Sequence, residues 1–158
     1  MYNLKKTNIM RTKLTSALIA LLSVFVLSAP ASADKDTPIN LNQLPAAAQQ
    51  VIKTHFAGKK VALAKYDKDL TDKSYDVIFT DGSKLEFDRN GKWTEIFCPT
   101  GSVPTALVPA AITQYVNTHY ASAKIVKIER DKRETEVKLS DGMEITFNTK
   151  YQVTDIDR

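Results

Sequence analysis

The stretch Leu44-Pro45-Ala46-Ala47 returns further along the chain as Val108-Pro109-Ala110-Ala111. In the same way, Thr54-His55-Phe56-Ala57 returns as Thr118-His119-Tyr120-Ala121. Both recurrences have an offset of 64 residues (108 − 44 and 118 − 54). A period of this size is typical of one supersecondary unit that occurs twice. The sequence therefore predicts that one unit is present in two copies.

A second recurrence predicts the same hairpin in each copy. Thr80-Asp81-Gly82 returns as Ser140-Asp141-Gly142, at an offset of 60 (141 − 81). Asp-Gly is a strong two-residue hairpin signal because Gly accepts the positive φ that the turn needs. Asp88 to Gly91 predicts a further turn in the first copy. Its counterpart, Asn148 to Tyr151, lacks the Gly, so we expect a different turn type there.

Each copy is predicted to begin with a helix. Pro45 suits the first helical turn, and good helix formers follow over 46–56. Gly58 stands where a C′ residue would end this helix. The second copy begins in the same way at Pro109. Apolar residues fall at helical spacing in both copies: Ala48, Val51, Ile52 and Phe56, then Ile112, Tyr115, Val116 and Tyr120.

After each helix the hydrophobic period changes from 3.6 to 2, which indicates strands. The expected first strands are 61–66 and 125–129, and the expected fourth strands are 93–97 and 152–156. We predict an α+β fold in which each copy is a helix followed by a four-stranded antiparallel meander. The helices would cover the apolar face of the strands. The two meanders would join into one sheet with both helices on one face; two independent beads are the alternative.

The chain divides into five predicted segments. A signal peptide over 1–33 and a flexible lead-in over 34–43 precede the first repeat, 44–97. A linker over 98–107, which contains two prolines and a glycine, separates it from the second repeat, 108–158.

The first 33 residues are typical of an export signal. Four basic residues precede the apolar stretch 18–27, and Ala31-Ser32-Ala33 supplies the small residues of a cleavage site. The apolar stretch is short for a membrane span, although an uncleaved anchor is the alternative. No Cys stands at the cleavage point, where Asp34 follows Ala33, which argues against a lipoprotein anchor. We expect a periplasmic or secreted protein with no membrane attachment after the signal is removed.

Removal of the leader also removes the excess of positive charge. The leader holds four of the 22 Lys and Arg residues and no acidic residue, which leaves 18 (22 − 4) against 18 Asp and Glu. A neutral chain with interspersed charges has no electrostatic signature of a nucleic-acid or anionic-lipid partner. The remaining 125 residues (158 − 33) suffice for one sizeable core or two small ones.

These features resemble a known family. The Leu-Pro-Ala-Ala helix start, the Thr-His-aromatic helix end, the Asp-Gly hairpin and the strand Trp93-Thr94-Glu95-Ile96 are similar to the β-lactamase-inhibitor-like, PepSY-like exported proteins of Bacteroidetes. The resemblance covers nearly all of 41–158. It implies a tandem α+β fold like that of the β-lactamase inhibitory protein, with one sheet face open. Because the matched residues are packing and turn residues, it assigns no binding residue and no target.

The chain offers little catalytic or metal-binding chemistry. His55 and His119 are its only histidines, and a metal site would need both helix ends and further ligands together. Each is better explained as a residue in the last turn of a helix, where positive charge complements the helix dipole. Cys98 lacks a base to activate it and could stay buried or pair between chains. The cluster Asp67, Asp69 and Asp72 lacks the Gly and Glu of a calcium loop. We expect no cofactor and no enzyme.

The outward positions of the strands are the remaining candidate site. They predict one broad polar face, either an ordinary solvated surface or a docking platform for an exported protein, with Tyr66 or Trp93 as aromatic anchors if they point outward. Trp93 fits the core better. The candidate residues are Asp76, Lys84, Glu86, Thr94, Glu136, Lys138, Glu144 and Thr146. The sequence thus favours a non-enzymatic binding module that docks a protein or is inhibitor-like in the sense of the resembling family. The alternative is a small-ligand or metal-sensing envelope protein that uses the seam between the repeats.

Overall fold

The computed structural model describes residues 36–68 and 73–158. The predicted signal peptide, the start of the lead-in, and Asp69 and Asp72 of the acidic cluster lie outside these residues.

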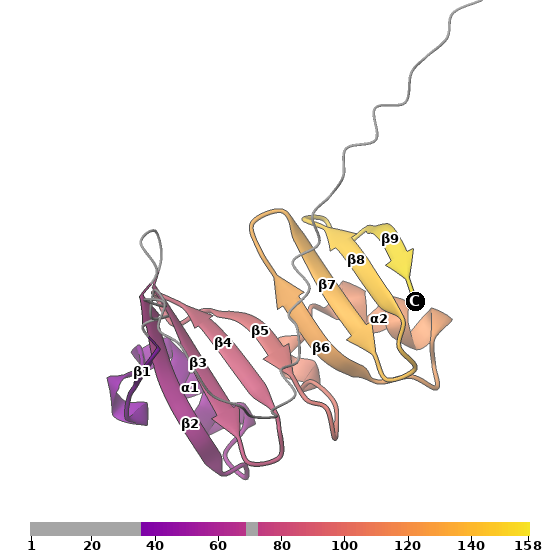
Figure 1. Ribbon diagram of the computed structural model, residues 1–158. Helices are drawn as coiled ribbons and strands as arrows, with labels where there is room; N and C mark the ends of the chain where they lie inside the picture. Colours follow the sequence, from indigo (N-terminus) through magenta and orange to yellow (C-terminus); the bar gives the residue numbers. More distant parts are fainter. Residues whose placement is uncertain (1–35, 69–72) are drawn as a thin grey trace, which may run out of the picture. The chain divides into compact units, whose positions relative to one another are not determined.

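Two helices and one antiparallel sheet make up the described part of the chain (Figure 1). The first half contains β1 (Thr37–Pro38), the short 3-10 helix η1 (Leu41–Gln43), α1 (Ala46–His55), β2 (Val61–Lys68), β3 (Lys73–Phe79), β4 (Lys84–Asp88) and β5 (Trp93–Phe97). The second half contains η2 (Thr105–Leu107), α2 (Ala110–His119), β6 (Ile125–Arg130), β7 (Glu134–Leu139), β8 (Glu144–Asn148) and β9 (Val153–Asp157). The predicted α+β class is confirmed.

The sheet is continuous, and its nine described strands follow one another in chain order. The two halves join where β5 pairs with β6, with Ile96 opposite Ile128. The ladder extends past β5, because the Cys98 amide donates a 2.7 Å hydrogen bond to the Val126 carbonyl. The joined sheet predicted from the sequence is therefore present, and the arrangement as independent beads is wrong.

Both helices pack against the same face of this sheet, which we call the inner face. One row of directly opposed aliphatic residues crosses six strands on this face, from β4 to β9. The first five residues of the row are fully buried, and the sixth, at the edge, is exposed. The row is Leu85, Ile96, Ile128, Val137, Ile145 and Ile156. Ala48 of α1 and Ile112 of α2 belong to the same buried cluster. Burial of large aliphatic and aromatic side chains contributes about 1.5–3 kcal/mol each, so this layer supplies most of the stabilisation.

The helix ends differ from the prediction at Gly58. Helix α1 ends at His55, and its last cap bond runs from the Phe56 amide to the Ile52 carbonyl at 2.9 Å. Phe56 then turns into the core and stacks on Phe79 with ring centroids 5.6 Å apart. Gly58 does not have a positive φ, so it is not the C′ residue that the sequence suggested. The helix ends instead at Phe56, the C-cap residue, whose φ of −129° lies outside the helical range.

The second turn is alike in the two halves, although only one has a glycine. Gly91 has φ 78° and Tyr151 has φ 57°, both in the left-handed region. The Gly91 amide bonds to the Asp88 carbonyl and the Tyr151 amide to the Asn148 carbonyl, each at 2.9 Å. The expectation of a different turn type at Tyr151 is therefore wrong. The Asn148 side chain accepts hydrogen bonds from the turn amides and holds Tyr151 in this conformation.

The lead-in and the linker are more integrated than the sequence indicated. Thr37 and Pro38 pair with β2, and the Ile39 amide donates a 2.9 Å hydrogen bond to Ala64. The described part of the lead-in is thus an edge strand and a 3-10 turn rather than a flexible segment. In the linker, Cys98 and Val103 are buried in the core.

Candidate functional site: the outer face of the sheet

The outer face is the sheet face opposite the helices, and its polar residues form two rows that run across the strands. We call the first the acidic row; it consists of Lys65, Asp76, Glu86, Glu95, Glu129, Glu136, Thr146 and Asp155, each directly opposite the next. We call the second the mixed row; it consists of Leu63, Ile78, Lys84, Phe97, Lys127, Lys138, Glu144 and Asp157. Because side chains alternate along a strand, both rows face away from the core.

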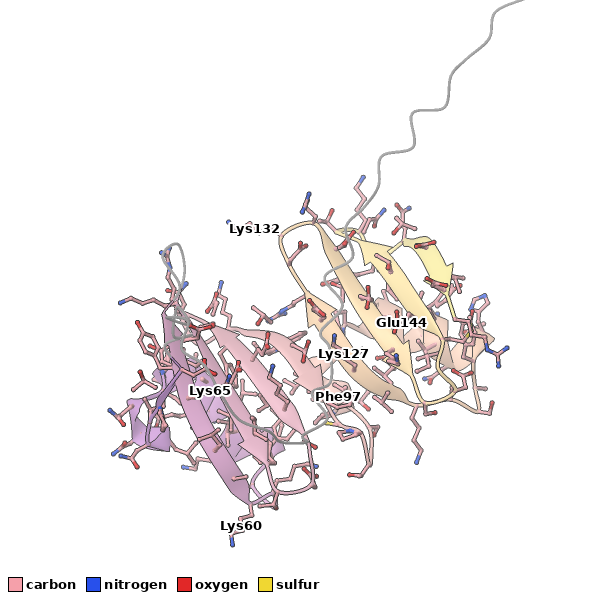
Figure 2. All side chains as sticks on the ribbon, in the orientation of Figure 1. Lys60, Lys65, Phe97, Lys127, Lys132 and Glu144 are labelled. Carbon is pink, nitrogen blue, oxygen red and sulfur yellow. The ribbon has the colours of Figure 1, made fainter. Side chains whose placement is uncertain are left out.

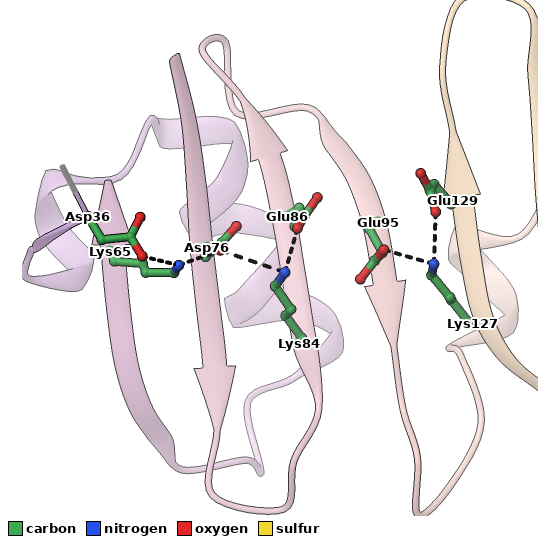
Figure 3. Close-up of polar contacts among 8 residues, drawn as sticks. All are labelled: Asp36, Lys65, Asp76, Lys84, Glu86, Glu95, Lys127 and Glu129. Carbon is green, nitrogen blue, oxygen red and sulfur yellow. Dashed lines mark hydrogen bonds and ion pairs between the residues drawn. The ribbon is translucent and has the colours of Figure 1, made fainter. Parts of the chain in front are cut away.

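In the first half, lysines lie between the carboxylates of the acidic row (Figure 3). Lys65 pairs with Asp36 and, at 3.2 Å, with Asp76. Lys84 pairs with Glu86 and lies 3.7 Å from Asp76. Burial alone would lower the pKa of Lys84, but its hydrogen bond to Glu86 and the nearby carboxylates outweigh this, and the pKa is raised. This network keeps the side chains in defined positions.

A second network bridges the two halves of the sheet. The Lys127 ammonium on β6 lies 3.0 Å from Glu95 on β5 and 2.8 Å from Glu129 on its own strand. Glu95 and Glu129 are directly opposite one another, so Lys127 offsets their repulsion. Burial raises the pKa of Glu95 despite this pairing. Burial would lower the pKa of Lys127, but the two carboxylates raise it well above its ordinary value.

The second half of the outer face has an excess of acidic groups. Lys138 pairs with Glu144 at 2.8 Å. Glu136 has no ion pair with any described residue, and its pKa is raised by burial and by the neighbouring Glu144 and Glu129. On β7, β8 and β9 the outward positions carry five carboxylates and one lysine: Glu134, Glu136, Glu144, Asp155, Asp157 and Lys138. Because residues 34–158 carry as many basic as acidic side chains, composition alone does not indicate this local excess of negative charge.

The structure places seven of the eight predicted site residues in the two rows. The exception is Thr94, which is the extra residue of a β-bulge, because Phe87 pairs with Trp93 while Glu86 pairs with Glu95. The bulge reverses the alternation along β5, so that Glu95 and Phe97 face outward. Nine further residues of the two rows were not among the predicted site residues: Leu63, Lys65, Ile78, Glu95, Phe97, Lys127, Glu129, Asp155 and Asp157. A one-residue bulge leaves no clear mark in an alternating pattern, so only the charge at Glu95 hinted at it.

The aromatic residue on this face is not one of those suggested. Tyr66 lies opposite Tyr75, which lies opposite the buried Phe87, so Tyr66 is on the inner face. Trp93 is buried, as expected. Phe97 is half-buried on the outer face and lies between Lys84 and Lys127 in the register; Figure 2 labels it beside Lys127. It is the aromatic side chain nearest the junction of the two halves on this face.

The other candidates for chemistry lie apart from this face. Nδ1 of His119 is 2.9 Å from the Tyr115 carbonyl, and the two rings stack with centroids 4.2 Å apart. Among the described residues, no group of three or more His, Cys, Asp and Glu could hold a metal ion. Cys98 is buried, and burial raises the pKa of its thiol, so it is not a reactive thiolate.

The seam between the halves is filled by side chains. On the inner side, Arg130 covers the ring of Trp93, and on the outer side Lys127 spans the two strands. A shallow hollow of the surface lies instead along η2 and α2, where Thr105, Val108 and Thr113 are among its lining residues.

Within the residues that the structure describes, neither helix is long and apolar enough to cross a bilayer. Comparison with curated proteins gave no match.

Solved structures from Bacteroides are similar to the chain over most of its length. A protein from Bacteroides vulgatus described as a putative periplasmic protein is 59% identical, with a TM-score of 0.78; the match covers 80% of this chain and 99% of the other. A protein from Bacteroides thetaiotaomicron described as a putative calcium-regulated periplasmic protein is 54% identical, with the same coverage and TM-score. A second Bacteroides vulgatus protein, described as a putative periplasmic protein of unknown function, is 39% identical with a TM-score of 0.74, covering 78% and 99%.

These relatives confirm the localisation expected from the leader, periplasmic or secreted. The resemblance drawn from the helix starts and the Asp-Gly hairpin is also confirmed, because a family model matches residues 73–155. The chain belongs to the family described as "putative beta-lactamase-inhibitor-like, PepSY-like".

Proposed function

We propose that this protein is an exported, non-enzymatic module that docks a partner protein on the outer face of its sheet. The observation that carries this proposal is the pair of charged rows, in which Lys65, Lys84 and Lys127 are each held between carboxylates (Figure 3). Side chains that are already fixed lose little conformational freedom on binding, which favours affinity.

Phe97 supplies the anchor that such a face needs. Interface energy is concentrated in a few central residues, and aromatic side chains surrounded by polar groups are typical of them. Phe97 has Lys84 and Lys127 on either side, and Ile78 lies beyond Lys84 in the same row. Phe97 is thus an apolar side chain with a lysine on either side.

We further propose that the two halves are copies of one ancestral unit. The support is the recurrence of sequence motifs, together with the same order of one helix and four strands in each half. The bulge at Thr94 in β5, opposite Glu86 and Phe87 of β4, also has a counterpart at Thr154 in β9, opposite Thr146 and Phe147 of β8. The outer face would then be a duplicated surface that has acquired different charges in its two halves.

A capture experiment tests the docking proposal. The chain from residue 34 onward would be immobilised and exposed to an envelope extract of its own host, and the retained proteins identified by mass spectrometry. A face variant would carry Lys84→Ala, Glu86→Ala, Phe97→Ala, Lys138→Ala and Glu144→Ala. We expect the wild type to retain one dominant protein, and the face variant to lose it while keeping its melting temperature within a few degrees.

The matched control alters the opposite side of the molecule. Gln114→Ala and Asn117→Ala on α2 change exposed polar residues away from the sheet. If this control loses the partner and the face variant retains it, docking occurs on the helices and the proposal is wrong. Because the family description is inhibitor-like, the captured protein would next be assayed for lost activity, with β-lactamase hydrolysis as the first assay where that enzyme is retained.

A second candidate function is the sensing of a metal ion or small ligand. It is favoured by the relative described as calcium-regulated. Calcium prefers carboxylate oxygens. Glu95 and Glu129 lie directly opposite one another, but no group of three such ligands lies together among the described residues, so further ligands would have to come from elsewhere. A ligand that binds only the folded state raises the melting temperature, so thermal unfolding in millimolar Ca²⁺ against EDTA tests this candidate. An unchanged melting temperature would count against it.

A further inference from the structure

Strand β5 is the last strand of the first half, and it binds a further antiparallel strand, β6, along its outer edge. Strand β5 pairs with β4 on one side and with β6 on the other. Ile96 on its inner face has no exposed surface, and Ile128 of β6 lies directly opposite it. The added strand thus completes the apolar layer.

Strand β9 has the same place in the second half, but no described strand lies beyond it. Trp93 pairs with Phe87 and Ile96 with Leu85; likewise, Val153 pairs with Phe147 and Ile156 with Ile145. Ile156 is the counterpart of Ile96 at an offset of 60 (156 − 96), yet it is 44% exposed. Ile96 is buried where β6 pairs beyond β5, whereas Ile156 is exposed where no described strand pairs beyond β9.

We propose that β9 binds an extended segment of a partner protein, which adds to the sheet as a further antiparallel strand. Addition of a strand to a sheet edge is a recurring mode of peptide recognition. The Cys98 amide donates to Val126 across the β5–β6 junction, and hydrogen-bonding residues alternate along a strand, so Ile96 also directs its backbone toward β6. By the same alternation, Ile156 presents its amide and carbonyl at the edge of β9.

The charge around this edge determines the chemistry of the segment. The outward positions of β7, β8 and β9 carry five carboxylates against Lys138. At the internal junction, Lys127 on the added strand offsets Glu95 and Glu129. The segment that fits β9 therefore places an apolar residue opposite Ile156 and basic residues opposite Asp155 and Asp157.

A second copy of this chain does not meet these requirements. Antiparallel pairing of two β9 strands with Ile156 opposite Ile156 would set Asp155 against Asp157 of the other copy, twice, and like charges directly opposite one another are destabilising. The strand at the other edge of the sheet, β1, has only the two residues Thr37–Pro38, neither of them basic, so it does not supply such a segment either. The occupant is therefore a different protein with a basic, alternating segment.

A synthetic peptide based on β6 tests the proposal. The probe copies residues 124–130, Lys-Ile-Val-Lys-Ile-Glu-Arg, with Lys in place of Glu129, and carries a fluorophore. A matched peptide carries Glu at both outward positions, 127 and 129. Titration with the chain from residue 34 onward is followed by anisotropy, and amide chemical shifts locate the binding. We expect the basic peptide to bind at least tenfold more tightly than the acidic one, with the shifts confined to β8 and β9.

Charge reversal at the edge gives the decisive comparison. In the double variant Asp155→Lys with Asp157→Lys, the preference should invert, so that the acidic peptide binds more tightly. This inversion cannot result from misfolding, and Ile156→Asp should weaken both peptides at least tenfold. Glu86→Lys, on β4 and five strands from β9, should leave binding of both peptides unchanged. This variant separates the β9 edge from the proposed docking face. Four outcomes would overturn the proposal. The two peptides could bind equally, or neither could bind. The chemical-shift changes could be centred on β3 to β5, or sedimentation could show that the chain self-associates through β9.

Discussion

Arg130 on β6 covers the indole of Trp93 on β5, with its guanidinium carbon 3.5 Å from the ring centroid. Its Nε also donates a 3.0 Å hydrogen bond to the backbone carbonyl of Trp93. One side chain therefore joins the two halves of the sheet through both the ring and the backbone of the same residue. The planar guanidinium suits this double contact, because it stacks with its face and donates with its edge.

Replacement of Arg130 should weaken the junction. Arg130→Ala loses a partly desolvated cation–π contact and a charged hydrogen bond, and we expect the free energy of unfolding to fall by about 2 kcal/mol. Arg130→Lys keeps the charge but loses the planar stacking, so its free energy of unfolding should lie between those of the wild type and Arg130→Ala. The control is Arg133→Ala, whose side chain is 87% exposed and which should change stability by less than about 0.5 kcal/mol. Urea unfolding provides the measurement; equal effects at both positions would show that the contact with Trp93 contributes nothing.

The two left-handed turns should respond in opposite directions to substitution. A Cβ at Gly91 would lie 2.7 Å from Cβ of Pro45 and 2.9 Å from the Ala48 nitrogen, so Gly91→Ala combines backbone strain with a clash against α1. We expect a loss of about 2 kcal/mol in unfolding free energy. Tyr151→Gly should instead stabilise by about 0.5–1 kcal/mol, because relief of the left-handed strain exceeds the added entropy of the unfolded chain. Thermal unfolding of the two variants checks the sign; a destabilised Tyr151→Gly would mean that the ring contributes more than the strain.

These turns also show how far the sequence leads. The helix starts at Pro45 and Pro109 and the Asp-Gly hairpins were predictable, because local conformational preferences determine them and each occurs twice. The turn at Tyr151 was not, since Asn148 imposes a backbone conformation that Tyr rarely adopts by itself.

Only part of the candidate site was predictable from the sequence, and that part again depends on local turn geometry. Within a hairpin, the register follows from the turn, so Lys138 opposite Glu144 could be anticipated. The contact of Lys127 with Glu95 depends on the bulge in β5 and on the register between two strands that a long connection separates. Neither leaves a local signal in the sequence, and both are set by how the core packs.

The first hairpin should lose stability in acid in a way that the second does not. Asp81 accepts hydrogen bonds from Lys59 and from the Ser83 amide, and these lower its pKa from 3.8 to about 2. A carboxyl with a lowered pKa stabilises the fold above its unfolded value of 3.8, and this contribution is lost as the pH falls toward 2. Asp141, its counterpart, accepts from the Met143 amide at 3.2 Å, and Ala123 stands where the first copy has Lys59.

We therefore expect Asp81→Asn to destabilise the protein by about 1 kcal/mol at pH 7, and by progressively less below pH 3.8. Asp141→Asn should have a smaller effect, because no lysine among the described residues pairs with Asp141. Urea midpoints between pH 2 and pH 7 give both curves. Parallel curves for the two variants would mean that the Lys59 contact is of no energetic importance.

Glu136 should show the opposite dependence on pH. It lies directly opposite Glu129, and burial together with Glu144 and Glu129 raises its pKa above the ordinary 4.5. A carboxyl with a raised pKa in the folded state contributes most stability below pH 4.5, where it is protonated, and this contribution is lost as the pH rises through the folded pKa. At pH 7 the charged side chain therefore opposes folding.

Glu136→Gln should accordingly raise the unfolding free energy at pH 7 by about 0.2–1 kcal/mol, the range for removal of a like-charged pair across two strands. The gain should disappear below pH 4.5, where wild-type Glu136 is already neutral. Glu144→Gln is the matched control. It also removes a charge that repels Glu136, but it breaks the 2.8 Å ion pair of Glu144 with Lys138, so we expect no net gain. A Glu136→Gln variant that is less stable than the wild type at pH 7 would contradict the repulsion on which this argument depends.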